Sequence, residues 1–387
     1  MKRMVLMKYL MAGVIAATSI SNAAACTLLL YTDAKGRAYT GRTMEFVGET
    51  PNRLTYYPMG TRFESVTPDG KQGATFNSKY AIFAVTVFGI LPTQKQDSFH
   101  EAMNDQGLTF TTNSLGGNIS PNVTQIPQGK ILSAVDLGAW ALGNFQTVAQ
   151  VKQALENKEV EVWLPNIPFL GAGDTPLHFG LFDRSGAGIV IEWTTGKTTV
   201  YDNPVGVMTN NPPFPWHLQN MSNYAYLTNV DKNSGKFNNL RVSAFDSGGN
   251  LANLPSAQTS PGRFVKAAYY ATFVEKAKTP DQAILNLSHV MNNFDRPKNI
   301  SIDLPNDMPG GERTMTAPKN QKSSSEVTSW TVLRDLSQNL FYIRTINSLN
   351  FSRFDINKLS ALKETKVVSM KALNANSALD GTDLFLK

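Results

Sequence analysis

Apolar and polar positions repeat with two different periods along the chain, and each period predicts a type of element. Short runs rich in β-branched and aromatic residues, bounded by Gly, Pro, Asn or Asp, predict strands. Apolar residues at steps of three and four predict helices. The predicted strands cover residues 26–31, 38–44, 79–88, 108–114, 177–182, 188–193, 198–201, 205–209, 330–335 and 340–345. The predicted helices cover residues 132–143, 147–157, 263–278 and 280–293, and a long loop is predicted at 306–326.

The order of these elements indicates the fold class. Strands come in runs that are interrupted by pairs of helices, which favours antiparallel sheets sandwiched by helices over a parallel, doubly wound sheet. No repeated unit recurs along the chain. We therefore expect a single domain over residues 26–387, preceded by a separate segment at residues 1–25.

The first 25 residues have a pattern of their own. Three basic residues stand near the start, residues 9–20 are mainly apolar, and three alanines end the segment. A basic head, a short apolar run and an A-x-A site are typical of a secretory signal peptide. The apolar run is too short to span a membrane, which takes about 20 residues. We expect cleavage after Ala25 and a secreted, periplasmic protein that begins at Cys26.

Cys26 is the only cysteine of the 387 residues, and its place after the predicted cleavage site admits two explanations. It is either a nucleophile at the N-terminus or the acylated residue of a lipid-anchored binding or structural protein. Bacterial lipoprotein signals usually carry Leu three residues before the cysteine, where this chain has Ala23. Because a lipidated sulfur cannot be a nucleophile, the two explanations exclude each other, and the sequence favours the nucleophile.

Composition narrows the chemistry further. The chain has 36 basic and 30 acidic residues but no dense run of Lys and Arg, so a nucleic-acid partner is not expected. A single cysteine excludes an internal disulfide, and the four histidines have no metal-ligand spacing. No G-x-S-x-G stretch predicts a serine nucleophile. We therefore expect thiol chemistry without a metal or another cofactor.

An N-terminal cysteine can carry its own base. A thiol with a pKa near 8.5 is only a few per cent thiolate at pH 7, so it needs a proton acceptor. The α-amine of the same residue has a pKa of about 7.7–8.0. It can accept the thiol proton and later pass it to a leaving nitrogen. Removal of the signal peptide would then also be the activation step.

The turn after the first strand determines which residues lie beside the sulfur. Asp33 and Gly36 suit a three-residue loop with a left-handed glycine, so Cys26 is predicted to face Met44. Arg42 then lies diagonally beside Cys26 on the same face of the hairpin. A fixed cation next to the sulfur lowers the pKa of the thiol. A two-residue loop would instead turn Arg42 to the opposite face.

Four short motifs follow this cysteine in a characteristic order. After Cys26, the chain reads GRTM at residues 41–44, EAMNDQGL at 101–108, VGVMTNNP at 205–212 and PGRF at 261–264. Together they resemble the choloylglycine hydrolase family, which comprises bile salt hydrolases and penicillin V acylases. The second motif departs from the family's G-M-N-E-x-G-L pattern, because Ala102 stands in place of its first glycine.

The resemblance spans residues 26 to about 345 and implies a fold and an activity. The implied fold is α+β, a four-layer αββα sandwich of two antiparallel sheets flanked by helices, as in N-terminal-nucleophile hydrolases. The implied reaction is hydrolysis of a small-molecule linear amide through a thioester, without a cofactor, in a homotetramer. A signal peptide before the cysteine resembles the Gram-negative secreted branch, which is associated with penicillin V and N-acyl homoserine lactones more than with conjugated bile salts.

The resemblance also implies roles for individual residues. Cys26 would be nucleophile and, through its amine, base; Arg42 would support the thiolate; Asn210 would donate to the oxyanion; and Arg263 would be a second arginine of the site. A further oxyanion contributor falls on Asn113 or Ser114, and the sequence leaves both open.

Glu45 stands where the family usually has Asp and is included as a residue that orients the terminal amine. Strand alternation places Glu45 on the face away from Cys26, so a bulge or a strand end is needed for that role.

Overall fold

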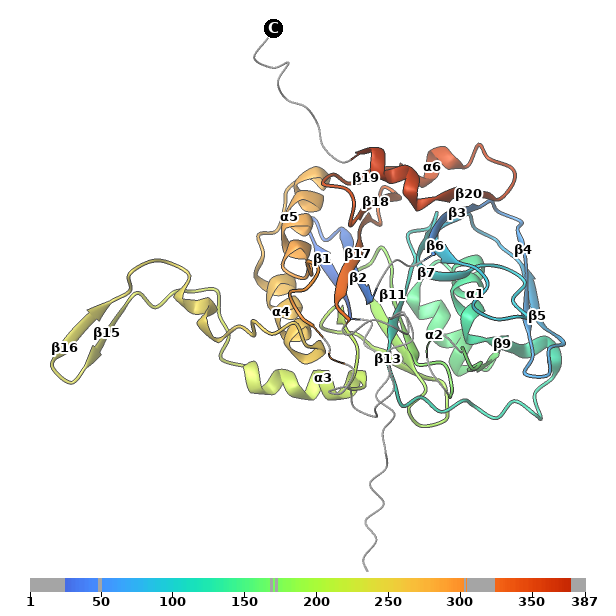
Figure 1. Ribbon diagram of the computed structural model, residues 1–387, viewed down its shortest axis with the longest axis horizontal. Helices are drawn as coiled ribbons and strands as arrows, with labels where there is room; N and C mark the ends of the chain where they lie inside the picture. Colours follow the sequence, from blue (N-terminus) through green and yellow to red (C-terminus); the bar gives the residue numbers. More distant parts are fainter. Residues whose placement is uncertain are drawn as a thin grey trace, which may run out of the picture.

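The structure, a computed structural model, describes residues 25–47, 51–167, 170, 173–302, 304 and 324–376. The predicted signal peptide, except Ala25, and most of the predicted loop at 306–326 lie outside these residues. Two large antiparallel sheets lie face to face, and helices cover the outer side of each (Figure 1). The αββα sandwich predicted from the sequence is therefore confirmed.

The first sheet contains the predicted N-terminal hairpin at its centre. Its first two strands pair in the predicted register, with Cys26 opposite Met44. Gly36 closes the turn at φ 76°, a left-handed conformation that glycine adopts without steric cost. In spatial order the strands are β14 (Val207–Met208), β1 (Cys26–Thr32), β2 (Ala38–Val47), β17 (Glu326–Asp335), β18 (Leu340–Thr345) and β19 (Ser352–Asp355).

The second sheet approaches the first closely near the site. A Cβ added at Gly180 would lie 2.8 Å from Leu28 Cδ2 and 3.0 Å from Met208 Cε, so only glycine allows this spacing of the two sheets. In spatial order the strands are β13 (Thr199–Asp202), β12 (Gly188–Glu192), β11 (Leu177–Phe182), β8 (Thr109–Ser114), β7 (Ser98–Asn104), β6 (Ile82–Val87), β3 (Arg53–Tyr57) and β20 (Lys366–Ser369).

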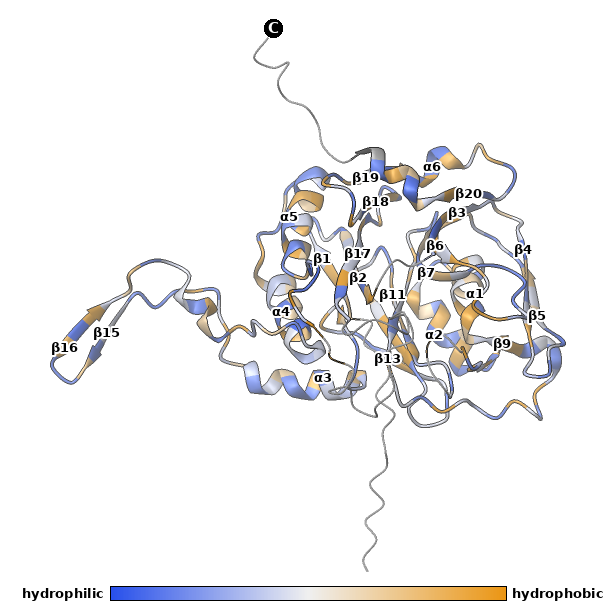
Figure 2. Cartoon of the chain, in the orientation of Figure 1, coloured by the Kyte–Doolittle hydropathy of each residue, from blue (hydrophilic) through white to orange (hydrophobic). Residues whose placement is uncertain are grey.

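Two pairs of helices form the outer layers. α4 (Ser260–Phe273) and α5 (Pro280–Asn292) pack on the first sheet, and α1 (Leu137–Asn144) and α2 (Val148–Glu156) pack on the second. Figure 2 shows hydrophobic and hydrophilic residues alternating along α5, as expected of a helix with one buried side. One hydrophobic cluster fills the layers on either side of the first sheet, and a second lies between the second sheet and α1 and α2.

An arm between α3 (Phe214–Asn220) and α4 extends away from the two sheets (Figure 1). It carries the hairpin of β15 (Ser234–Phe237) and β16 (Leu240–Ser243), in which Phe237 is 71% exposed and Leu240 is 64% exposed. Among the described residues, we find no helix with the length and apolarity needed to span a membrane. Besides short 3-10 turns, the remaining elements are the parallel pair β9 (Ile131–Ser133) and β10 (Glu161–Trp163), the pair β4 (Arg62–Val66) and β5 (Gln72–Asn77), and α6 (Ile356–Leu359).

The sequence prediction was wrong at several boundaries. The helix predicted at 132–143 begins only at Leu137, because the preceding residues form β9 and pair with β10 instead. The helix predicted at 263–278 starts at Ser260, where Thr259 caps it, and ends at Phe273. The predicted pattern did not include β7, a buried strand interrupted by the charged residue Glu101.

Candidate active site

Cys26 and Arg42 meet on the face of the first sheet that packs against the second. Leu28 pairs with Arg42 across the hairpin, which puts Arg42 on the diagonal from Cys26. Arg42 Nη2 lies 3.3 Å from Cys26 Sγ and donates to the carbonyl oxygen of Thr112 at 2.7 Å. The predicted proximity of cation and sulfur is therefore present in the structure.

The thiol of Cys26 is only 1% exposed. Burial raises its pKa to about 11, since the interior disfavours the thiolate; Arg42 acts against this rise and the carboxylate of Glu45 adds to it. The thiol of the chain that still carries Ala25 is thus protonated at neutral pH. A proton acceptor is needed before this sulfur can act as a nucleophile.

Arg42 is held rigidly by its surroundings. Its Nε lies 3.3 Å from the carboxylate of Glu101, which also forms an ion pair with Arg334, and all three side chains are fully buried. The guanidinium carbon lies 4.5 Å from the ring centroid of Trp330, so the ring covers one face of the cation. These contacts keep the positive charge beside the sulfur.

Asn210 lies two residues after the end of β14 and contacts the nitrogen of Cys26. Its Oδ1 accepts hydrogen bonds from Cys26 N at 2.9 Å and from Arg263 Nη2 at 2.8 Å. Its Nδ2 donates to the carbonyl oxygen of Ser114 at 2.9 Å, which uses one of the two amide hydrogens. Asn210 therefore links the main-chain nitrogen of the cysteine to the second sheet.

Arg263 approaches Cys26 from the first turn of α4. Its Nη1 donates to the carbonyl oxygen of Cys26 and, at 2.9 Å, to Thr27 Oγ1. Arg263 is 1% exposed, and burial lowers its pKa to about 10, so it remains a cation at neutral pH. Arg263 thus holds the main chain of Cys26 from the α4 side of the first sheet, while Asn210 holds its nitrogen.

Asn113 and Ser114, adjacent on β8, contact the site differently. Asn113 Nδ2 donates to the carbonyl oxygen of Thr209 at 2.7 Å and lies 3.5 Å from that of Met208. Its two amide hydrogens are thus directed at main-chain carbonyls rather than at an open position. Ser114 contributes the carbonyl oxygen that accepts from Asn210. In this arrangement both residues support the loop that carries Asn210.

Glu45 lies on the face away from the thiol, as strand alternation predicts. Its Oε1 accepts from Thr328 Oγ1 at 3.0 Å, and its main-chain N–H donates to the carbonyl oxygen of Ala25 at 2.9 Å. Burial raises the pKa of Glu45, while the charge of Arg263 opposes this shift. A register irregularity does occur opposite, between Thr328 and Trp330, but it leaves the Glu45 side chain on the α4 side.

Sequence reasoning missed three buried polar residues near Asn210. His178 and Glu192 lie side by side on β11 and β12, and His217 Nε2 lies 2.9 Å from the carbonyl oxygen of Asn210. The available signal was a single histidine or glutamate within an otherwise apolar strand pattern, at residues 177–182 and 188–192.

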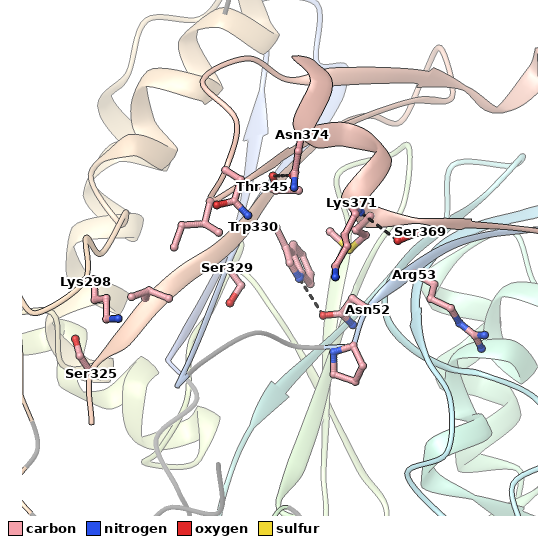
Figure 3. A pocket seen from close by; sticks show the side chains of 15 residues that line it. Asn52, Arg53, Lys298, Ser325, Ser329, Trp330, Thr345, Ser369, Lys371 and Asn374 are labelled. Carbon is pink, nitrogen blue, oxygen red and sulfur yellow. Dashed lines mark hydrogen bonds between the residues drawn. The ribbon is translucent and has the colours of Figure 1, made fainter. Parts of the chain in front are cut away.

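A pocket opens at the end of the two sheets where β1 begins (Figure 3). Its volume is about 700 Å³, and Trp330, which stacks on Arg42, forms part of its wall. Lys298 and Lys371 contribute positive charge, Arg53 is paired with Asp97, and none of the 15 described residues that line the pocket carries a carboxylate. The pocket is therefore suited to a polar, negatively charged group.

No metal centre is formed by the described residues. Nowhere among them do three or more His, Cys, Asp or Glu side chains gather in a way that could hold an ion. The chemistry that the described site can perform is that of the thiol, the neighbouring main-chain nitrogen, two arginines and an amide.

Comparison with known proteins gives one family. The model of the linear amide C–N hydrolases, choloylglycine hydrolase family, matches residues 26–370, so the matched span begins at Cys26. A bile salt hydrolase/transferase of Clostridium perfringens is 26% identical over 360 residues, covering 90% of this chain and 100% of that protein. A conjugated bile acid hydrolase of Lactobacillus acidophilus is 31% identical over 257 residues, covering 63% of this chain and 73% of that protein.

Solved structures show the same fold. A variant of conjugated bile acid hydrolase from Clostridium perfringens superposes with a TM-score of 0.73 at 22% identity, covering 92% of this chain and 99% of that chain. Penicillin V acylase from Agrobacterium tumefaciens superposes with a TM-score of 0.66 at 21% identity, covering 88% of this chain and 90% of that chain.

Proposed function

Because the chain belongs to the choloylglycine hydrolase family of linear amide C–N hydrolases, we propose that it cleaves an N-acyl amide through Cys26 once that residue is the first of the mature protein. The proposal rests on two contacts of Cys26, one through its sulfur and one through its main-chain nitrogen. Cys26 Sγ lies 3.3 Å from Arg42, and its nitrogen lies 2.9 Å from Asn210 Oδ1. Sulfur and nitrogen are thus held in place together.

In the proposed reaction, the free α-amine accepts the proton of the Cys26 thiol while Sγ attacks the carbonyl carbon of the substrate. The tetrahedral intermediate collapses when the ammonium group returns its proton to the leaving nitrogen and the C–N bond breaks. Water then attacks the thioester, its proton passes to the amine, and breakage of the C–S bond releases the acid and restores the thiol.

The remaining residues of the site have distinct proposed roles. Arg42 stabilises the sulfur as it loses its proton. The second amide hydrogen of Asn210 is the proposed donor to the developing oxyanion. A contact of this type lowers the activation barrier by about 3–4 kcal/mol. Arg263 holds the carbonyl group of Cys26, so that the amine is aimed at Asn210. Glu45 and Asn113 act through contacts with their neighbours, and Glu45 reaches the thiol through its main-chain N–H rather than its carboxylate.

Lipid anchoring through Cys26 is the weaker alternative. The thiol is 1% exposed and lies between two sheets, 3.5 Å from Met44 Sδ. Acylation of the sulfur would require this packed position to open. We propose instead that a signal peptide ending at Ala25 directs the protein to the periplasm and that its removal creates the amine, as in the Gram-negative secreted branch of the family.

The proposed substrates are penicillin V, N-acyl homoserine lactones and conjugated bile salts. The cationic pocket at Trp330 favours those whose amine half carries an acid, namely penicillin V and the conjugated bile salts. A panel of the three classes, compared by kcat/KM, distinguishes them.

We also propose a homotetramer. The arm between α3 and α4 exposes several large apolar side chains, with Phe245 the most exposed. A second copy of this chain is the partner that we propose to cover them.

The test is made on the processed protein. Intact mass should give a chain that begins at Cys26 without a diacylglycerol adduct, and iodoacetamide should modify it once and abolish hydrolysis. Cys26→Ala should have no activity, and a form with an additional N-terminal alanine should keep its fold but lose the reaction. Full amidase activity in Cys26→Ala would end the proposal.

A further inference from the structure

Two buried ionisable side chains lie behind Asn210 and take no part in the proton transfers described above. His178 is 1% exposed and Glu192 is fully buried. His178 Nδ1 lies 3.0 Å from Glu192 Oε1, and its Nε2 lies 3.1 Å from the carbonyl oxygen of Thr209. The imidazole ring thus bridges a strand of the second sheet and the loop that carries Asn210.

The contacts of the His178 ring determine how many protons His178 and Glu192 carry together. A carbonyl oxygen only accepts, so His178 Nε2 must carry a hydrogen to bond Thr209. A second hydrogen must lie between Nδ1 and Glu192 Oε1, because two bare lone pairs at 3.0 Å would repel. The pair is therefore neutral overall, either as imidazolium and carboxylate or as imidazole and acid, which a dry site tolerates far better than an isolated charge.

The same carboxyl group also holds the segment that follows Asn210. Glu192 Oε1 accepts from the main-chain N–H of Phe214 at 2.9 Å, while Oε2 has no hydrogen-bond partner among the described residues. Glu192 thus connects to the loop on both sides of Asn210, through His178 to Thr209 and directly to Phe214.

The main chain around Asn210 is restrained from several elements. Its N–H donates to Ser260 Oγ at 3.0 Å, and its carbonyl oxygen faces His217 Nε2 at 2.9 Å. The Thr209 carbonyl oxygen, which shares a peptide unit with the Asn210 N–H, accepts from both His178 and Asn113. A shift of that peptide unit would turn the side chain that contacts the Cys26 nitrogen.

We infer that His178 and Glu192 are positioning residues of the reaction: they fix the Thr209 carbonyl group and, through it, the direction of the Asn210 side chain. The inference rests on the proposed function of Asn210. Neither residue contacts the sulfur, so their effect is transmitted entirely through the loop. Loss of orientation at a reacting group lowers kcat more than it changes KM.

The test uses three substitutions of Glu192 that differ in hydrogen bonding. Glu192→Gln keeps the contact with Phe214 through its amide oxygen, but His178 Nδ1 faces that same oxygen, so the amide cannot also donate to a neutral His178 there. We expect a smaller loss of kcat than in Glu192→Leu. Glu192→Leu removes both contacts and should lower kcat by more than about tenfold, with KM nearly unchanged. Glu192→Asp shortens the side chain by one methylene group, so its kcat should lie between those of the other two variants. It takes the place of Glu192→Leu in the test if that variant does not fold.

The readout separates positioning from mere stability. Rates are expressed per Cys26 thiol titrated with iodoacetamide. Because an unfolded chain is alkylated as well, circular dichroism and intact mass first establish that each variant is folded and begins at Cys26. The matched control is Asp335→Leu, which removes a buried carboxyl group at the far end of the first sheet. It should lower the unfolding free energy but not kcat per titrated thiol. Equal kcat in the Leu and Gln variants of Glu192, or an equal loss in the control, would overturn the inference.

Failure of the inference and failure of the proposed function give different results. If the wild-type protein hydrolyses no amide, or if Cys26→Ala is active, the proposed function is wrong. If the wild type depends on Cys26 and Glu192→Leu retains its full kcat, only the positioning role is wrong.

Discussion

The carboxylate of Glu101 and the guanidinium of Arg42 form an ion pair at 3.3 Å in which both side chains are completely buried. Arg334 pairs with the same carboxylate from the other side. One acid therefore compensates two buried cations, one of which lies beside the thiol. This arrangement makes Glu101 important for stability as well as for the charge near Cys26.

Removal of this acid should strongly destabilise the fold. Glu101→Leu leaves Arg42 and Arg334 uncompensated in the interior, and we expect a loss of about 3–5 kcal/mol in unfolding free energy. Urea denaturation at pH 7.5 measures it. The control is Asp202→Ala, which removes the partner of Lys152 at the surface and should cost less than about 1 kcal/mol. Equal losses in both variants would contradict the prediction.

The charge of Arg42 should control the reactivity of the thiol. Without it, the pKa of Cys26, already raised by burial, rises further, and each unit of pKa is a tenfold loss of thiolate. Alkylation of Arg42→Leu by iodoacetamide should be at least about tenfold slower between pH 7 and 8.

Two further variants of arginine test whether charge is the cause. Arg42→Lys keeps a cation and should recover part of the alkylation rate. Arg37→Leu removes an arginine in the turn, where it pairs with Asp33, and should alkylate like the wild type. The prediction fails if both leucine variants react at the same rate.

His217 should make the protein sensitive to acid. Burial lowers its pKa to about 4 in the folded protein, whereas in the unfolded chain it is about 6.5. As pH falls below 6.5 the unfolded state takes up the proton first, so stability decreases between pH 6.5 and 4, by at most about 3 kcal/mol. In His217→Gln the amide can still donate to Asn210, and the urea midpoint should change less between pH 7.5 and 4.5. An equal change in both proteins would exclude His217 as a source of acid sensitivity.

Part of this site could be predicted from the sequence because it is local. Gly36 determines the turn, the turn determines the register, and the register brings Arg42 to Cys26 within 17 residues of chain. The resemblance located Asn210 and Arg263, but their contacts with Cys26 depend on how β14 pairs with β1 and how α4 packs on the first sheet. The role of Asn113 in the loop likewise depends on the second sheet, which no local pattern places.

Other parts of the site do not follow the apolar patterns that predict buried strands, and each has a physical reason. Glu101 places a charge within the buried strand β7, and the interior accepts it only because two arginines from the other sheet reach it. His178 and Glu192 could have been found, because the predicted hairpin around residues 184–186 places them opposite each other. The pocket could not have been predicted, since its walls come from β3, from β17 and from the segment after β20 that contains Lys371.

The arm should be required for assembly. If a second copy covers its apolar side chains, Phe237→Ser together with Phe245→Ser should shift the protein from a tetramer to smaller species in size-exclusion chromatography with light scattering. Hydrolysis per subunit should change little, because the arm lies outside the two sheets (Figure 1). A control pair, Lys232→Ser and Lys236→Ser, changes polar residues of the same arm and should leave the tetramer intact. A monomeric wild type would refute the prediction.

The pocket should distinguish charged from neutral amine halves. Lys298 and Lys371 are exposed, belong to no ion pair among the described residues and lie on opposite sides of the cavity (Figure 3). Each neutralised cation should therefore raise KM for penicillin V or a glycine conjugate by about three- to tenfold, since a charge-assisted contact contributes about 1 kcal/mol or more. A neutral N-acyl homoserine lactone has no such contact to lose, so its KM should be unchanged in Lys298→Gln and Lys371→Gln. Lys236→Gln in the arm controls for net charge, and equal effects on charged and neutral substrates would show that the pocket does not bind the amine half.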